Sequence, residues 1–243
     1  PLLATLGLAK TLSMGEKEQG KGSQKYNWPF VALLSAFTAI QIVFHLLLTS
    51  QPENITYLMQ VAVLMMAAMT LWVAGRVLPF FTRARLQSPG KDLPKGLLEM
   101  SMGSSWLVIP FYLAAQITDN TALSIITAIL ALSAAASQSY RLAIFYRPGV
   151  SKEPMLWSLY LAFAWLITGY GLIAINLIMD ISNTSQGAQL PWLHAMTIGG
   201  LLSMIISMMA RISLGHTGRQ IMALPFMAVS FGLLQVATLV RLL

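Results

Sequence analysis

The chain has 243 residues, of which 56% are hydrophobic and only 9% are charged, and its net charge is +7. Soluble domains carry about 25% charged residues, so this composition excludes an ordinary soluble protein and indicates a membrane protein. Cysteine is absent, which excludes disulfides, thiolate metal sites and a catalytic thiol within the chain.

The first 27 residues form two predicted segments. Residues 1–9 are apolar but too short to cross a bilayer, and no basic region typical of a signal peptide precedes them. We expect them to be the end of a truncated helix, with an interfacial helix as the alternative. The chain is then the carboxy-terminal part of a longer protein, and the missing amino-terminal half is a further partner. Residues 10–27, rich in Gly, Lys and Gln, predict a flexible cytoplasmic linker.

The remainder, residues 28–243, predicts an all-α, polytopic transmembrane helix bundle of about seven spans. A helix needs about 20 apolar residues to cross the roughly 30 Å hydrocarbon core. Long apolar runs without strand-like alternation favour helices over a β-barrel. Pro79 is expected to end or kink the second span. The predicted spans are residues 28–48, 56–78, 97–118, 121–146, 154–180, 191–213 and 220–243.

Positive charge is distributed unevenly between the two sides of this bundle. Fourteen of the fifteen Lys and Arg residues fall on one side, and only Arg241 falls on the other. By the positive-inside rule the basic side is cytoplasmic, and the carboxy terminus is periplasmic. The net charge reflects this asymmetry within a lipid bilayer and does not indicate a nucleic-acid-binding surface. Arg141 and Arg147 are both interpreted as charges of a cytoplasmic loop.

Polar residues within the spans are costly and are therefore functional candidates. His45 and His194 lie about one turn from the outer ends of the first and sixth spans, at about 1.5 Å per residue, and so at similar depth. Two imidazoles at one depth on different helices suit haem or copper ligation. The alternative is that each imidazole binds a neighbouring carbonyl. His216 lies at the cytoplasmic end, far from both.

A basic cluster is predicted at the cytoplasmic ends of the second and sixth spans. Arg76, Arg211, His216 and Arg219 are expected to hold these spans together and to bind an anion or a propionate. The alternative is plain positive-inside charge. Gly199, Ser203 and Ser207 recur every four residues on the sixth span, which predicts close approach of a neighbouring helix.

Three motifs in this sequence resemble the NnrS family. The first is Gly75-Arg-Val-Leu-Pro-Phe-Phe-Thr82, the second is Pro154-Met-Leu-Trp157, and the third begins at His194-Ala-Met-Thr-Ile-Gly199 and continues through Arg211 to Arg219. The resemblance covers essentially the whole chain. It implies a bacterial inner-membrane protein of about a dozen helices, of which this chain holds about the last seven.

The same resemblance implies bound haem and copper and protection against nitric oxide and nitrosative stress, alongside denitrification. No settled enzymatic reaction belongs to the family, so an enzymatic activity is left open. By resemblance, His194 and His216 are the family-motif histidines, and together with His45 they are the candidate cofactor-binding residues. One departure is Tyr160, where family members often carry a histidine three residues after the second motif.

Two classes of function therefore stay open. The first is a haem- and copper-binding membrane protein that handles nitric oxide. The second is a transporter or channel for an anion or a metal complex, with an arginine-lined cytoplasmic mouth. A helix interrupted at Gly169-Tyr170-Gly171 would suit the second class. The family resemblance favours the first.

Overall fold

The computed structural model describes residues 7, 35–45, 55–89, 91, 93–182 and 191–242. All regular structure in these residues is helical, which confirms the predicted fold class. The chain divides into two units, Pro1–Ala62 and Val63–Leu243, and each is described by itself. The first unit contains an apolar helix at Ser35–His45, which is the described part of the predicted first span. The predictions for residues 1–9 and 10–27 lie outside the described residues, apart from Gly7.

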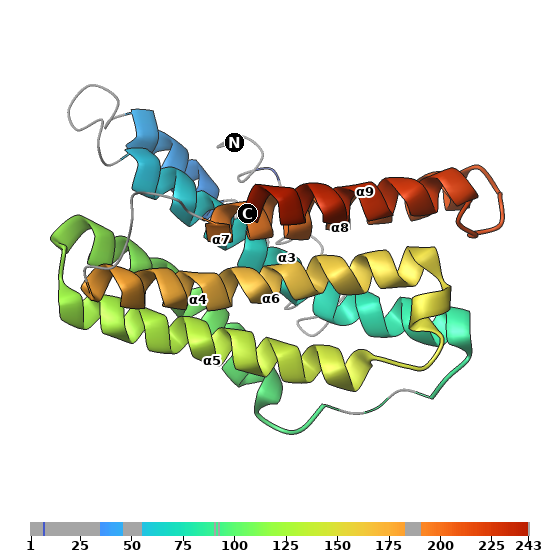
Figure 1. Cartoon of the computed structure of the whole chain (residues 1–243), viewed down its shortest axis with the longest axis horizontal. Coiled ribbons are helices and arrows are strands. Elements are labelled where there is room, and N and C mark those ends of the chain that lie inside the picture. Colours follow the sequence, from blue (N-terminus) through green and yellow to red (C-terminus); the bar gives the residue numbers. More distant parts are fainter. Residues whose placement is uncertain are drawn as a thin grey trace. The chain divides into compact units, whose positions relative to one another are not determined.

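Long helices make up the second unit (Figure 1). Each long helix runs antiparallel to the one that follows it. α4 packs on α5, α5 on α6, and α6 on the helix of the sixth span and on α9. The elements are α3 (Ile55–Leu86, which enters this unit at Val63), α4 (Leu97–Thr118), α5 (Thr121–Phe145), the short 3-10 helix η2 (Val150–Lys152), α6 (Pro154–Ile181), α7 (Pro191–His194), the π-helix η3 (Ala195–Leu202), α8 (Ser203–His216) and α9 (Pro225–Leu242).

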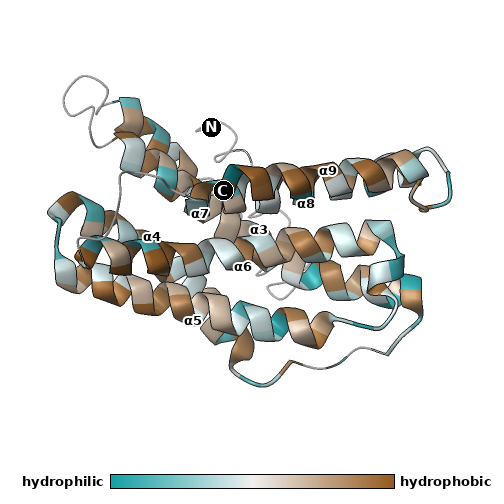
Figure 2. Cartoon of the chain, in the orientation of Figure 1, coloured by the Kyte–Doolittle hydropathy of each residue, from teal (hydrophilic) through white to brown (hydrophobic). Residues whose placement is uncertain are grey.

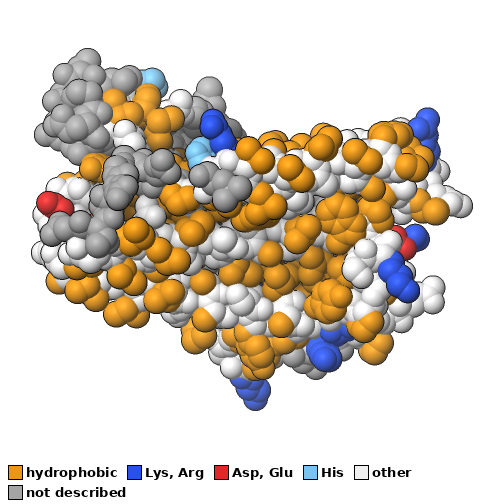
Figure 3. All heavy atoms as spheres, in the orientation of Figure 1, with side chains coloured by type: hydrophobic (Ala, Val, Ile, Leu, Met, Phe, Trp, Pro, Cys, Tyr) orange, Lys and Arg blue, Asp and Glu red, His pale blue; other side chains and the backbone are white. Residues whose placement is uncertain are grey.

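Six helices of the described chain are long and apolar enough to cross a membrane, and α7, η3 and α8 form one of them. Hydrophobic residues run along every long helix in Figure 2, and hydrophobic side chains cover most of the face shown in Figure 3. On α9 the side chains of Val229, Leu233 and Val236 are each more than half exposed. An apolar surface of this kind suits contact with hydrocarbon.

Of the two alternatives for Pro79, that it ends or that it kinks the second span, the first is wrong, because α3 continues through Pro79 to Leu86. Proline removes one backbone hydrogen bond and crowds the preceding turn. On either side of it Leu78 and Thr82 are fully buried, and the Thr82 hydroxyl donates to the Leu78 carbonyl at 2.7 Å. Packing of this stretch therefore outweighs the lost bond. The helix ends at Leu86, eight residues beyond the predicted end of the span at residue 78.

The basic loops of the second unit meet at one end, toward the right of Figure 1. Arg85 forms an ion pair with Glu153 at 3.0 Å, which joins the end of α3 to the start of α6. Arg147 donates to the Pro89 carbonyl at 3.4 Å, which joins the α5–α6 and α3–α4 loops. We call this the basic end. Its position agrees with the charge pattern from which the orientation was predicted.

The orientation itself is a testable prediction. Green fluorescent protein fused after Leu243 of the full-length protein should be exported to the periplasm and should not fluoresce there. The reason is that the positive-inside rule keeps the basic end in the cytoplasm and so places the carboxy terminus on the other side of the membrane. The same reporter inserted after Gly149, in the α5–α6 loop, should fluoresce. Fluorescence of the fusion after Leu243 would show that the predicted orientation or the number of spans is wrong.

Candidate functional site

The helix of the sixth span widens directly after His194. Residues Ala195–Leu202 form a π-helix, in which the backbone amide of Ser203 bonds to the Ile198 carbonyl five residues earlier. The Ser203 hydroxyl donates to the same carbonyl at 3.1 Å. π-Helical turns are rare and are frequent at functional sites. The widened segment coincides with the motif that begins at His194.

Glycines allow this π-helix to lie directly against α6. A Cβ atom added to Gly199 would lie 2.8 Å from the Trp165 ring atom Cδ2, and one added to Gly200 would lie 2.7 Å from Leu166 Cγ. Real Cβ contacts essentially never come below 3.0 Å, so neither site has room for a side chain. The predicted close helix approach at Gly199 is therefore confirmed.

The glycines of α6 serve the same packing and do not interrupt their helix. α6 is continuous from Pro154 to Ile181. Gly169 receives the side chain of Met196 from the π-helix, whereas the space beside Gly171 is open. The suggestion of a broken helix at these two glycines is wrong. Gly169 has no side chain because the antiparallel neighbour packs against it, and the α-helical backbone continues through both glycines.

A polar link joins three helices beside the π-helix. The Trp165 indole donates to the Gln235 side-chain oxygen at 2.7 Å, and the Gln235 amide donates to the Ser203 hydroxyl at 3.3 Å. These residues lie on α6, α9 and the first position of α8. Hydrogen bonds within an apolar bundle hold side chains in one geometry, since a lost partner has no water to replace it. The link fixes Trp165 against Gly199.

His194 is half-buried and makes no hydrogen bond to any residue that the structure describes. The nearest hydroxyl along the helix, that of Thr197, donates to the Leu193 carbonyl at 2.6 Å and not to the imidazole. A buried or half-buried imidazole in a span usually has a partner, because an unpaired polar group is costly there. Among the described residues, no hydrogen-bond partner of the His194 imidazole would compete with a ligand.

The other two predicted histidines have different surroundings. His45 is exposed and ends the described helix of the first unit, where its ring lies 5.7 Å from the ring of Phe44. Because the two units are described separately, the pairing of His45 with His194 stays a prediction. His216 is exposed and is the last residue of α8. Within the described ranges, no three His, Asp or Glu side chains gather as a metal site.

Of the predicted basic cluster, only Arg211 is buried. Its guanidinium lies 4.4 Å from the centroid of the Phe81 ring on α3 and donates to the Met155 carbonyl at the start of α6. Arg211 thus links the second and sixth spans through its contact with Phe81. Arg76 is exposed and its guanidinium lies over the Trp72 ring of its own helix. His216 and Arg219 are exposed as well.

Comparison with known families decides the membership of the chain. The family model described as NnrS protein matches residues 2–243. The chain belongs to the NnrS family. No curated protein and no solved structure matches it.

The first motif of this NnrS chain makes room for a buried arginine. A Cβ at Gly75 would overlap the guanidinium of Arg141 and would lie 3.1 Å from its central carbon. Arg141 is 1% exposed and donates to the side-chain oxygens of Gln138 at 2.8 Å and Ser101 at 3.2 Å. The interpretation of Arg141 as a loop charge is wrong, because it lies inside the bundle among α3, α4 and α5.

Sequence reasoning missed this group because its position, one turn from the end of a span, suits a loop charge equally well. A polar network continues from it: the Gln138 amide donates to the Ser105 hydroxyl at 3.2 Å, and the buried Tyr170 donates to the Ser105 carbonyl at 3.3 Å. No carboxylate in the described part of the chain pairs with Arg141. Polar residues at 101, 105 and 138 in otherwise apolar spans were the available signal.

Thr82, the last residue of the first NnrS motif, contacts the residue that departs from the family pattern. The hydroxyls of Thr82 and Tyr160 lie 2.9 Å apart, and the Tyr160 hydroxyl donates to the Phe145 carbonyl at 2.7 Å. Tyr160 thereby joins α6 to α3 and to the end of α5. These contacts give Tyr160 a structural role in this NnrS chain.

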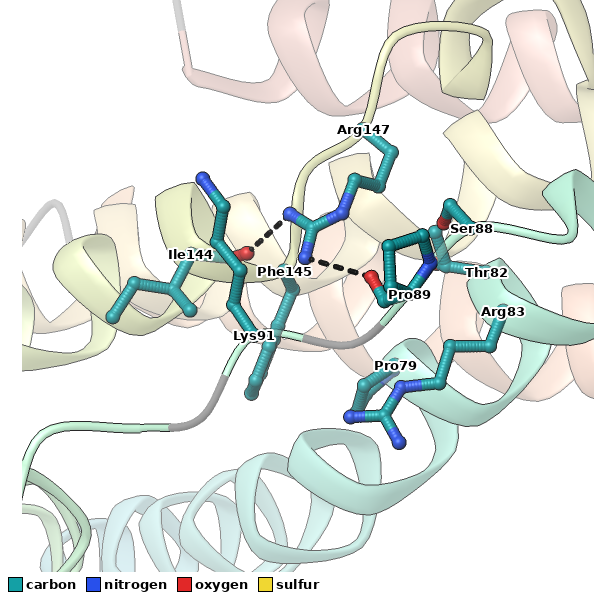
Figure 4. A pocket seen from close by; sticks show the side chains of 9 residues that line it. All are labelled: Pro79, Thr82, Arg83, Ser88, Pro89, Lys91, Ile144, Phe145 and Arg147. Atoms are coloured by element: carbon teal, nitrogen blue, oxygen red, sulfur yellow. Dashed lines mark hydrogen bonds between the residues drawn. The ribbon is translucent and has the colours of Figure 1, made fainter.

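Arg147 is also more than a topology charge. It donates to the carbonyls of Ile144 and Tyr146 at 2.8 Å each and reaches Pro89, as Figure 4 shows for Ile144 and Pro89. The last carbonyls of a helix lack partners within the helix, and a basic side chain can satisfy them. Arg147 therefore caps α5 and borders a small cavity. The residues that line the cavity are Pro79, Thr82, Arg83, Ser88, Pro89, Lys91, Ile144, Phe145 and Arg147.

Proposed function

We propose that this protein is a haem- and copper-binding membrane protein that acts in the response to nitric oxide. Membership of the NnrS family suggests a role in that response. The observation that carries the metal part is the surroundings of His194. This half-buried imidazole has no hydrogen-bond partner among the described residues and immediately precedes a π-helix within the most specific family motif.

The chain offers one side chain that suits a haem or copper centre as a ligand. His194 supplies a neutral imidazole, which suits both metals. Its helix is held in place by the contacts of Gly199 with Trp165 and by the link from Trp165 through Gln235 to Ser203. A further ligand would come from His45. When bound, either metal would supply the coordination position for nitric oxide.

The first experiment measures the cofactors directly. Purified full-length protein is expected to show a Soret absorption band, and elemental analysis should find copper in a fixed ratio to protein. Addition of nitric oxide to the reduced protein should shift the Soret band if haem is its binding site. A colourless protein without copper after expression with added haem precursor and copper would overturn the proposal.

A transporter or channel for an anion or a metal complex is the second candidate. The buried Arg211 at the basic end favours it, because a cation beside an opening attracts anions. Against it, α6 is continuous through both of its central glycines. The absorption and copper measurements separate the first candidate from a transporter of an anion, since transport of an anion requires neither cofactor.

A further inference from the structure

A cavity of about 520 Å³ opens at the basic end, between the ends of α3 and α8 and the start of α6. Its lining is of two kinds. Apolar side chains come from α3, α6 and the α8–α9 loop, and charged or amide groups lie among them. The lining residues used below are Phe81, Arg85, Glu153, Met155, Arg211 and Met222.

Arg211 is the charge in this lining that lacks a counterion. It is 6% exposed, and its Nε atom is buried without a hydrogen-bond partner. The acid nearest to it in the lining, Glu153, is engaged by Arg85 at 3.0 Å. Arg211 makes no ion pair with a described residue: its guanidinium contacts the Met155 carbonyl and the Phe81 ring, and Glu153 attracts it only from beyond ion-pair distance. A buried cation without a counterion strongly favours a bound anion.

The start of α6 adds to the positive potential at the same place. Glu153 precedes the helix, yet its side chain makes no capping hydrogen bond to the first amides. Met155, in the first turn, lines the cavity. The amino-terminal end of a helix carries a partial positive charge, so it reinforces the effect of Arg211 on an anion.

The rest of the lining identifies the kind of anion. Phe81, Met155 and Leu156 present apolar groups, and Met222 at the rim is half exposed. A small, fully hydrated anion gains nothing from such a surface. An anion that carries hydrocarbon chains fits both halves of the lining. The cavity also lies at the end of the spans, where headgroups of the bilayer meet the protein, and basic pockets between spans bind acidic lipids.

We propose that this cavity binds the headgroup phosphate of an acidic phospholipid, with Arg211 as its principal contact and the acyl chains against Met155 and Met222. The proposal does not depend on haem or copper. The bound lipid joins α3, α6 and α8 at the basic end and neutralises Arg211. A free phosphate ion carries the same chemical group as the lipid headgroup, and the experiment distinguishes the lipid from the free ion.

The experiment is native mass spectrometry of delipidated full-length protein. Dioleoyl phosphatidylglycerol should be retained, and dioleoyl phosphatidylcholine, which has the same chains and no net charge, should be lost at lower collision energy. Arg211→Gln should weaken phosphatidylglycerol retention about tenfold, because a charge-assisted contact to phosphate is lost. Arg241→Gln, which changes an exposed arginine in the last turn of α9, away from the cavity, should leave retention unchanged.

A second pair of variants keeps the test valid if Arg211→Gln does not fold. Met222→Glu adds a negative charge at the exposed rim and should expel phosphatidylglycerol, whereas Met222→Gln, of the same size and neutral, should retain it. Equal retention of the two lipids, or retention unaffected by Met222→Glu, would refute the proposal. Displacement of phosphatidylglycerol by millimolar inorganic phosphate would also refute it, and would assign the site to a free oxyanion.

Discussion

His194→Ala in the full-length protein should abolish binding of haem, copper or both, measured per mole of protein against the parent. The expected loss is nearly complete, because a metal centre loses much of its affinity when one ligand is removed. A ligand on another helix cannot take the place of the imidazole that immediately precedes the π-helix. The close contacts of Gly199 and Gly200 with α6 are made with Trp165 and Leu166 and not with the imidazole, so the variant should still insert and fold.

Two further histidine variants make this result specific. His216→Ala changes an exposed family-motif residue at the basic end and should retain the cofactor bound near His194. His45→Ala tests the predicted opposite ligand and should change the absorption spectrum if His45 completes the centre. A stably inserted His194→Ala protein with haem and copper at the parental ratio would remove His194 from the ligands and leave it a packing residue.

Gly199→Ala should destabilise the bundle, whereas Gly171→Ala should not. The added methyl at position 199 meets the ring of Trp165 and the methyl group of Thr238, both at under 3.0 Å, and Trp165 is held by Gln235. Overpacking of this kind costs about 1–3 kcal/mol. At position 171 nothing lies within 4 Å of the new methyl, and alanine there gains up to about 1 kcal/mol in helix propensity.

The measurement is the thermal unfolding midpoint of each purified variant in one detergent, followed by tryptophan fluorescence. The two substitutions add the same methyl group to helices that contact each other, so the sign of the difference reports on local space alone. A lower midpoint for Gly199→Ala with an unchanged or higher midpoint for Gly171→Ala is expected. Equal shifts in the two variants would contradict the close contact between the π-helix and α6.

The amino-acid sequence alone determined the helices of this protein. The predicted span 97–118 has the bounds of α4, and the predictions at 121–146 and 154–180 differ from α5 and α6 by one residue. The physical reason is that a bilayer requires about 20 apolar residues with all backbone hydrogen bonds made inside the segment, and both conditions are local to the chain. The asymmetry of Lys and Arg is local in the same way.

Only the tertiary structure decided the roles of the residues near the ends of the spans. Arg141 and Arg147 are six residues apart and read alike in the sequence, yet the first is buried between three helices and the second caps α5. Which of them is buried depends on Gly75 and Ser101, which lie on other helices.

The π-helix after His194 and the continuity of α3 through Pro79 have the same origin. Neither follows from the local preference of its residues, since Met196 needs Gly169 of α6 beside it, and Thr82 needs Tyr160. In an apolar bundle every buried polar group and every bulky side chain must find its partner on a neighbouring helix. The sequence identifies the buried polar and bulky residues that need a packing or hydrogen-bond partner. The packing of the helices determines which partner each of them has.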